Sequence, residues 1–212
     1  MSKQKLVIFT AIGLIAFFMI AGTLYKNYQM EEFSAMSKER AELFERPYSW
    51  SIGNKDAKVH LVEFFDPACE TCAQFYPLVK GIMKKNEGKI RLTLRYATYH
   101  PGSDQVVKML EAARQQGKFA EALEMLFATQ QQWTRNHRAN PEAVWQLMGR
   151  LGLDIDKFIE AMKSPEIDKI IQQDLADAKV LGATKTPSYF VNGKPLQRFG
   201  YEELKELIYS EL

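Results

Sequence analysis

Apolar and polar residues along the chain follow two different periods, and the changes between them predict the elements. Residues 59–65 are apolar and β-prone, and residues 90–96 alternate apolar with polar side chains, so both segments predict strands. Between them, apolar side chains recur at helical spacing: Phe75, Leu78, Val79, Ile82 and Met83. This order predicts a strand, a helix over about residues 70–85 and a second strand. Such a βαβ unit places the two strands in parallel.

A long helical stretch follows, over about residues 100–182. Residues typical of helix starts open most of its segments: Ser103, Asn140, Asp154 and Ser164. We expect helices over about residues 103–116, 119–132, 141–151, 154–163 and 165–181. The last one carries an apolar stripe that predicts a buried face: Ile167, Ile170, Ile171, Leu175, Ala178 and Leu181.

The pattern then returns to β character. Residues 188–191 predict a short strand, Asn192-Gly193 is a strong hairpin signal, and residues 194–198 predict the return strand. A final helix is expected from Tyr201 to the end of the chain. The order βαβ, helical insertion, ββα predicts an α/β protein with a thioredoxin-like fold that an inserted α-helical domain divides.

The first 24 residues differ from the rest of the chain. A run without charge extends from Leu6 to Leu24, and Lys3 and Lys5 precede it. About 19 residues at about 1.5 Å each give roughly 28 Å, close to the hydrocarbon thickness of a bilayer. We expect one uncleaved transmembrane helix over residues 1–24; a cleaved signal segment is the alternative, although Ala21-Gly22-Thr23 matches a cleavage site poorly. Basic residues before the span place the folded part outside the cytoplasm.

Residues 25–50 are polar and mixed, with a loose helical pattern of apolar side chains. We expect a tether, helical in part, that holds the folded domain of residues 51–212 away from the membrane. The alternative is a helix that pairs with its own copy and makes a homodimer.

Charge excludes one class of function. The formal net charge of +2 comes from Lys3 and Lys5, since the remaining chain balances 26 basic against 26 acidic residues. A nucleic-acid-binding protein usually carries a one-sided basic surface, which this balance argues against. We therefore expect no nucleic-acid partner.

The only two cysteines, Cys69 and Cys72, lie three residues apart where the first strand meets the following helix. A disulfide at this spacing closes almost no loop, so it stabilises little, and a dithiol that opens and closes is the better interpretation. Cys69 at the helix N-terminus is the expected exposed nucleophile, and Cys72, one turn deeper, the shielded resolving thiol. An inert bridge is the alternative. A zinc site is disfavoured because the histidines, His60, His100 and His137, lack metal-ligand spacing.

Two motifs carry a resemblance to a known family. The segment Glu63-Phe64-Phe65-Asp66-Pro67-Ala68-Cys69-Glu70-Thr71-Cys72, together with Thr186-Pro187-Ser188-Tyr189-Phe190-Val191-Asn192-Gly193, resembles the DsbA family of thiol-disulfide oxidoreductases in the thioredoxin superfamily. The resemblance covers about residues 50–212. It implies that Glu63 is a buried acid that relays the proton of Cys72, whereas a solvated glutamate at a strand end is the alternative. It also implies that Pro187 is a cis proline facing the cysteines, with the Thr186 backbone free to bind substrate, rather than a trans proline at a strand start.

The two residues between the cysteines, Glu70 and Thr71, are expected to tune the redox potential. A carboxylate about 7 Å from the Cys69 sulfur opposes ionisation by about 0.6 kcal/mol at water-like dielectric, or roughly half a pKa unit. Strongly oxidising family members resemble Cys-Pro-His-Cys, where a histidine favours the thiolate. We therefore expect a milder oxidant, with no metal and no cofactor besides the Cys69–Cys72 disulfide.

Three residues after the second strand, Tyr96, Tyr99 and His100, are candidates to line a groove near the site, although a histidine beside Pro101 is more typical of a loop. Trp133 is expected to pack in the core or at a domain interface.

These observations predict a membrane-anchored thiol-disulfide oxidoreductase on the periplasmic side of the inner membrane. Its expected partners are exported protein substrates and a membrane redox protein, either a quinone-linked oxidase or a reductase. Two alternatives stay open: a disulfide isomerase or reductase of the same fold, and a non-enzymatic, membrane-tethered chaperone or binding module. The sequence leaves the direction of electron flow undetermined.

Overall fold

The structure, a computed structural model, describes residues 3–39 and 41–212, and the side chains of residues 3–11 and 34–39 are outside the description. The chain divides into two units, Met1–Ala41 and Glu42–Leu212.

The first unit is formed by one long helix, α1 (Lys3–Glu39), which runs through the predicted anchor and most of the predicted tether. Within the part of the chain that the structure describes, no helix combines the length and apolar character that crossing a membrane requires. The span expected over residues 1–24 includes residues 1–11, whose side chains lie outside the described set.

The second unit is built on a five-stranded sheet in the order β1-β3-β2-β6-β7. Its strands are β1 (Trp50–Ile52), β2 (Val59–Phe65), β3 (Ile90–Tyr96), β6 (Ser188–Val191) and β7 (Lys194–Pro195). The parallel pairing of β2 with β3 is confirmed, and the other pairs are antiparallel. The sequence did not predict β1, and β7 is shorter than expected.

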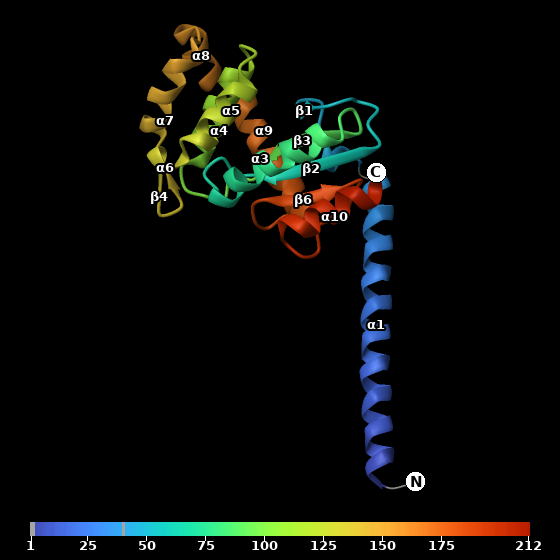
Figure 1. The fold of residues 1–212 in the computed structure, drawn as a ribbon. Helices are drawn as coiled ribbons and strands as arrows, with labels where there is room; N and C mark the ends of the chain where they lie inside the picture. Colours follow the sequence, from blue (N-terminus) through green and yellow to red (C-terminus); the bar gives the residue numbers. More distant parts are fainter. Residues whose placement is uncertain (1–2, 40) are drawn as a thin grey trace. The chain divides into compact units, whose positions relative to one another are not determined.

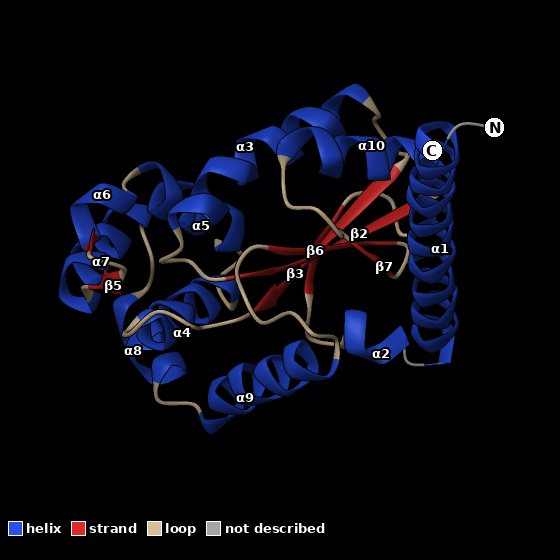
Figure 2. Cartoon of the chain, turned by 90° about the horizontal axis from the view of Figure 1, so that it is seen from below, coloured by secondary structure: helices blue, strands red, loops and turns tan. Residues whose placement is uncertain are grey.

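Helices cover both faces of the sheet. α3 (Glu70–Lys85) and α10 (Tyr201–Glu211) lie along one face, and α9 (Pro165–Val180) lies along the other (Figure 2). The buried stripe of α3 consists of Cys72, Phe75, Tyr76, Val79 and Ile82. Leu78 was expected in this stripe, but it is 38% exposed because its position falls beside the line that these residues follow.

The inserted helices gather at one end of the sheet (Figure 1). They are α4 (Ser103–Arg114), α5 (Phe119–Ala128), α6 (Gln130–Trp133), α7 (Pro141–Met148) and α8 (Ile155–Met162), with a 3-10 turn over Gly149–Leu151 and a small hairpin of β4 (Thr134–Arg135) and β5 (Arg138–Ala139). The predicted helix over 119–132 is divided at Thr129 into α5 and α6.

Three of the four predicted helix caps are confirmed: the side chains of Asn140, Asp154 and Ser164 accept hydrogen bonds from the first N–H groups of α7, α8 and α9. Ser103 is different. It is the first residue of α4, with Gly102 at the N-cap position, and its hydroxyl shares one proton between the Asp66 carboxylate and the carbonyl of His100.

A buried ion-pair group joins α9 to the sheet. The Arg95 side chain of β3 is fully buried, and its guanidinium donates to Asp174 (2.6 and 2.9 Å) and to Asp177 (2.7 Å) of α9. A further donor reaches the carbonyl of Leu43 at 2.7 Å, and Arg46 binds Asp177 with two hydrogen bonds of 2.8 Å. These charges lie on the same face of α9 as its apolar stripe and fix the helix against the sheet.

Candidate active site

The loop between β2 and α3 places Cys69 at the helix N-terminus. Cys69 is the N-cap residue, with extended backbone dihedrals. The loop is held by Asp66, whose carboxylate accepts from the Ala68 N–H at 2.8 Å and whose carbonyl accepts from the Cys69 N–H at 3.0 Å. The unpaired N–H groups of the first helical turn are therefore available to the Cys69 sulfur, as predicted.

The surroundings of Cys69 favour its thiolate. A hydrogen bond from the Cys72 thiol is the largest influence, and together with hydrogen bonds from the Thr186 side chain and from the backbone N–H groups of Cys72 and Thr71 it lowers the pKa of Cys69 to about 6, against the effect of burial. Hydrogen bonds to the sulfur, rather than the exposed Glu70, dominate this shift. The helix-terminal thiol is therefore ionised near neutral pH.

The prediction that Cys69 is exposed is wrong, since the residue is only 5% exposed. The reason is a segment more than a hundred residues away in sequence: the carbonyl oxygen of Thr186 lies 3.3 Å from the Cys69 sulfur and covers it.

The pKa of Cys72 is shifted in the opposite direction to that of Cys69. It is fully buried, and burial, its hydrogen bond to Cys69 and the nearby Glu63 carboxylate raise its pKa well above the usual value for a thiol. Both cysteines are free thiols in the structure. The pair thus combines one easily ionised thiol with one that stays protonated.

Glu63 lies in the interior, which confirms the expectation of burial and contradicts the solvated alternative. It is 1% exposed, and burial raises its pKa to about 8. The neighbouring Tyr189 lowers this pKa and the charge of Cys69 raises it. The Tyr189 hydroxyl is itself buried, yet it makes no hydrogen bond of ordinary geometry with any residue that the structure describes.

The Thr186-Pro187 peptide bond is cis, which confirms the prediction. Pro187 directly precedes β6, and the Thr186 carbonyl faces Cys69. The two predicted motifs therefore meet at one place in the fold, although 117 residues separate Cys69 from Thr186.

Asp66, His100 and Ser103 form a hydrogen-bonded group beside the cysteines, and only His100 was predicted from the sequence as a candidate residue of this site. The backbone N–H and the ring Nδ1 of His100 each donate to Asp66 at 2.8 Å, and the Ser103 hydroxyl donates to the same carboxylate oxygen at 3.1 Å. The hydrogen bond to Asp66 is the main reason that the pKa of His100 is raised, and the charges of Cys69 and Glu70 raise it further. The sequence favoured a loop position without a role for His100. In the structure its imidazole is part of the electrostatic surroundings of Cys69.

Gln130 of α6 was missed entirely. It is 6% exposed, and its Nε2 donates to the carbonyls of Pro67 at 2.8 Å and Cys69 at 3.0 Å, so it holds the cysteine loop from the inserted domain. A glutamine 61 residues beyond Cys69 gives no local signal of this role. In the described part of the chain, no three His, Cys, Asp or Glu side chains cluster as a metal site would require.

Two solved structures share the fold of this chain. A solved structure of a thioredoxin-like oxidoreductase from Silicibacter pomeroyi DSS-3 is 29% identical, with a TM-score of 0.69, and the match covers 81% of this chain and 96% of that chain. The thiol-disulfide exchange protein alpha-DsbA2 from Wolbachia pipientis shares the fold, with a TM-score of 0.71 and 17% identity over 86% of this chain and 97% of that one.

Among curated proteins, a Na(+)/H(+) antiporter NhaA from Herminiimonas arsenicoxydans is 32% identical over 145 residues, which are 68% of this chain and 22% of the antiporter. The chain thus spans about a fifth of the length of the curated relatives it matches.

The family model described as "Thioredoxin" matches residues 45–210, which include both cysteines, Glu63 and Thr186-Pro187. The resemblance to DsbA-like oxidoreductases is confirmed in the fold, and the chain belongs to the thioredoxin family.

Proposed function

We propose that this protein is a thiol-disulfide oxidoreductase that exchanges disulfides with client proteins through Cys69 and Cys72. The observation that carries the proposal is the unequal pair of thiols: the pKa of Cys69 is lowered to about 6, whereas that of Cys72 is raised well above its usual value. A reactive thiolate beside a protonated partner one helical turn deeper is the arrangement that two-step exchange requires.

In the reducing direction, the Cys69 thiolate attacks one sulfur of a client disulfide, and the other client sulfur leaves as a thiolate. The mixed disulfide is then resolved when Cys72 loses its proton and attacks the Cys69 sulfur, so that the client thiolate leaves and a Cys69–Cys72 disulfide forms. The client gains two electrons and the protein loses two. In the oxidising direction the same steps run in reverse, and Cys72 leaves Cys69 as a thiolate that must take up a proton.

Glu63 is the group proposed to accept and return that proton. Its carboxyl is buried next to Cys72, and a pKa of about 8 lets it bind or release a proton near neutral pH. A proton acceptor is needed at this place because Cys72 is fully buried. We also propose that Glu70 and Thr71 tune the redox potential, so that the protein is a mild oxidant. A potential as oxidising as about −120 mV, measured by titration against glutathione, would refute this proposal.

The setting of the reaction is also proposed. An N-terminal anchor would hold the domain on the periplasmic side of the inner membrane, with exported proteins as clients. A quinone-linked oxidase or a reductase in the membrane would then regenerate the cysteine pair. The uncharged run from Leu6 to Leu24 supports the anchor, and α1 could bring two copies together as a homodimer. Fractionation of cells that express the full chain, with and without residues 1–24, tests the anchor.

Alkylation kinetics test the chemistry directly. Iodoacetamide should modify Cys69 with a midpoint near pH 6, while Cys72 stays unmodified in the folded protein. If Cys69 reacts at neutral pH no faster than free cysteine, the oxidoreductase proposal fails. A Cys72→Ser variant should accumulate mixed disulfides with clients, and a Cys69→Ser variant should form none. Retention of biological activity by Cys69→Ser would instead favour the chaperone alternative.

The redox state of the Cys69–Cys72 pair in vivo distinguishes the two directions of electron flow. A mainly oxidised pair identifies a disulfide donor, and a mainly reduced pair identifies an isomerase or reductase.

A further inference from the structure

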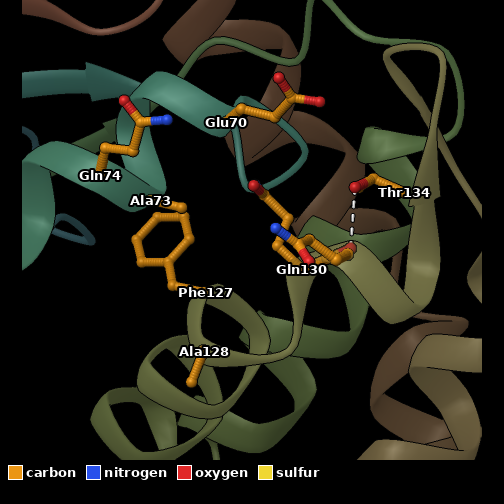
Figure 3. Close-up of a pocket in the computed structure, with 8 residues that line it drawn as sticks. Glu70, Ala73, Gln74, Phe127, Ala128, Gln130 and Thr134 are labelled. Carbon is orange, nitrogen blue, oxygen red and sulfur yellow. Dashed lines mark hydrogen bonds between the residues drawn. The ribbon is translucent and has the colours of Figure 1, made fainter.

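A cavity of about 570 Å³ opens beside the cysteine loop, between the first turn of α3 and the helices α5 and α6 of the inserted domain (Figure 3). Its walls include Glu70 and Gln74 of α3, Phe127 of α5, and Gln130, Gln131 and Thr134 from α6 and the start of β4. Glu70 directly follows Cys69, so the cavity wall begins one residue from the cysteine that would bind a client.

Gln130 presents a fixed acceptor to this cavity. Both neighbours of its Nε2 are carbonyl oxygens, of Pro67 and Cys69, so the amide nitrogen must face the cysteine loop and the orientation of the amide is determined. Its Oε1 accepts no hydrogen bond from any residue that the structure describes, and this atom is open to solvent, since among the described residues only the Tyr189 hydroxyl is a fully buried side-chain oxygen or nitrogen without a partner. An accessible acceptor whose orientation is fixed by the two hydrogen bonds of its amide nitrogen suits a ligand that donates hydrogen bonds.

The charge of the residues that line the cavity also favours a cationic ligand. The lining contains one carboxylate, Glu70, and neither lysine nor arginine. Lys80, the first basic residue along α3, is paired with Glu124. His100 interacts electrostatically with Glu70, but its ring is bound to Asp66 in the cysteine loop. The cavity is therefore rich in acceptors and offers no fixed cation of its own among its lining residues.

Phe127 supplies an apolar surface. Its ring packs against Phe65 and Tyr76, with ring centroids 6.2 and 5.3 Å apart, and it borders the cavity beside Ala73 (Figure 3). A long aliphatic side chain with a cationic end can lie along such a ring and still reach the acceptors at the rim.

We propose that this cavity binds a lysine or arginine side chain of the client polypeptide, a few residues from the client cysteine that Cys69 attacks. The inference rests on the proposed function and adds a preference among clients. Gln130 and Glu70 would receive the cationic group, and Phe127 would contact its aliphatic stem.

The test compares disulfide-containing peptides that differ in one residue, arginine, norleucine or glutamate, placed two or three positions from the cysteine. The second-order rate constant of exchange with the full-length protein is measured for each peptide. We expect the arginine peptide to react about fivefold faster than the glutamate peptide, the effect of a partly exposed ion pair, with norleucine between them. The ratio of the two rates cancels any change in the intrinsic reactivity of Cys69.

Gln131→Lys places a cation in the wall and should reduce this ratio to about one. Gln172→Lys, an equal charge change at an exposed position of α9, should leave the ratio as it is. Equal rates for all peptides, or a ratio that Gln131→Lys does not change, would overturn the cavity proposal while the proposed function stands. Exchange with none of the peptides would instead refute the proposed function.

Discussion

Glu63 of β2 and Tyr189 of β6 are direct partners in the antiparallel register of the two strands, and both side chains are almost completely buried. The interior beneath the cysteines thus contains a carboxyl group whose pKa is raised to about 8 and a hydroxyl without an ordinary hydrogen-bond partner among the described residues. Such an arrangement costs stability, because a buried polar group without full hydrogen bonding is unfavourable. It also leaves a group that can exchange protons next to Cys72.

Replacing Glu63 by glutamine should stabilise the protein at high pH. The folded pKa of about 8 lies above the usual value of 4.5 for a glutamate, so the folded state binds more protons between these two values, and wild-type stability falls as the pH rises through this window. The Glu63→Gln variant does not lose stability in this way, because glutamine does not ionise. We expect little difference from wild type near pH 4 and a gain of a few kcal/mol at pH 9, at about 1.4 kcal/mol per pKa unit. Urea unfolding at both pH values measures the gain, with the exposed Glu202→Gln as control. A difference that does not change with pH would contradict the raised pKa.

The same substitution should slow resolution of mixed disulfides. Without the Glu63 carboxylate, Cys72 loses the proton acceptor proposed for it, and loss of a general base typically costs about a hundredfold in rate. Stopped-flow measurement of fluorescent peptide release from the Cys69 mixed disulfide follows this step between pH 6 and 10. The proton-transfer role of Glu63 is disproved if the variant has the wild-type pH dependence.

Tyr189→Phe should move the pH midpoint of resolution upward. The hydroxyl of Tyr189 lowers the pKa of Glu63, so its removal raises that pKa further and delays ionisation of the carboxyl. The same change in a Glu63→Gln background should have no effect on the midpoint, since the titrating group is absent. Tyr209→Phe, an exposed tyrosine of α10, is the control. An equal shift with and without Glu63 would show that Tyr189 acts only through packing.

His100→Gln should reduce the reactivity of Cys69 below neutral pH. The raised pKa of His100 keeps it protonated near pH 6, and this positive charge favours the neighbouring thiolate. We expect alkylation of Cys69 to slow about twofold at pH 6, because a rise of about half a unit from a pKa of about 6 halves the thiolate fraction there, and to be unchanged at pH 9. His60→Gln at the start of β2 is the matched control. Equal alkylation profiles for His100→Gln and wild type would exclude an electrostatic role for the imidazole.

Arg95→Met should destabilise the folded domain strongly. The substitution leaves the Asp174 carboxylate buried without its cation, and breaking a buried pair from one side costs about 3–5 kcal/mol. Lys169→Met on the same helix removes an exposed pair with Glu166 and should cost less than about 1 kcal/mol. Urea unfolding of both variants at pH 7 makes the comparison. Similar losses for the two would mean that the Arg95 group does not anchor α9.

Several elements could be predicted because their signals are local. The strands 59–65 and 90–96 and the helix 70–85 have the bounds that their periodicity indicated, since side-chain direction along one segment depends on backbone period alone. The caps at Asn140, Asp154 and Ser164 follow from hydrogen bonds within three residues. β1, by contrast, is only three residues long and forms through pairing with β3, so its own sequence gives little indication of it.

Local patterns in the sequence are enough to predict the order of the elements, the position of the cysteine pair at a helix N-terminus and the two motifs that meet around it. The covering of Cys69 by Thr186, the contact of Gln130 with the cysteine loop and the binding of Arg95 by buried aspartates of α9 became evident only in the folded chain. The physical reason is that burial and long-range hydrogen bonds depend on which distant segments pack together. Those contacts set the protonation of Cys69, Cys72 and Glu63, and no local pattern records them.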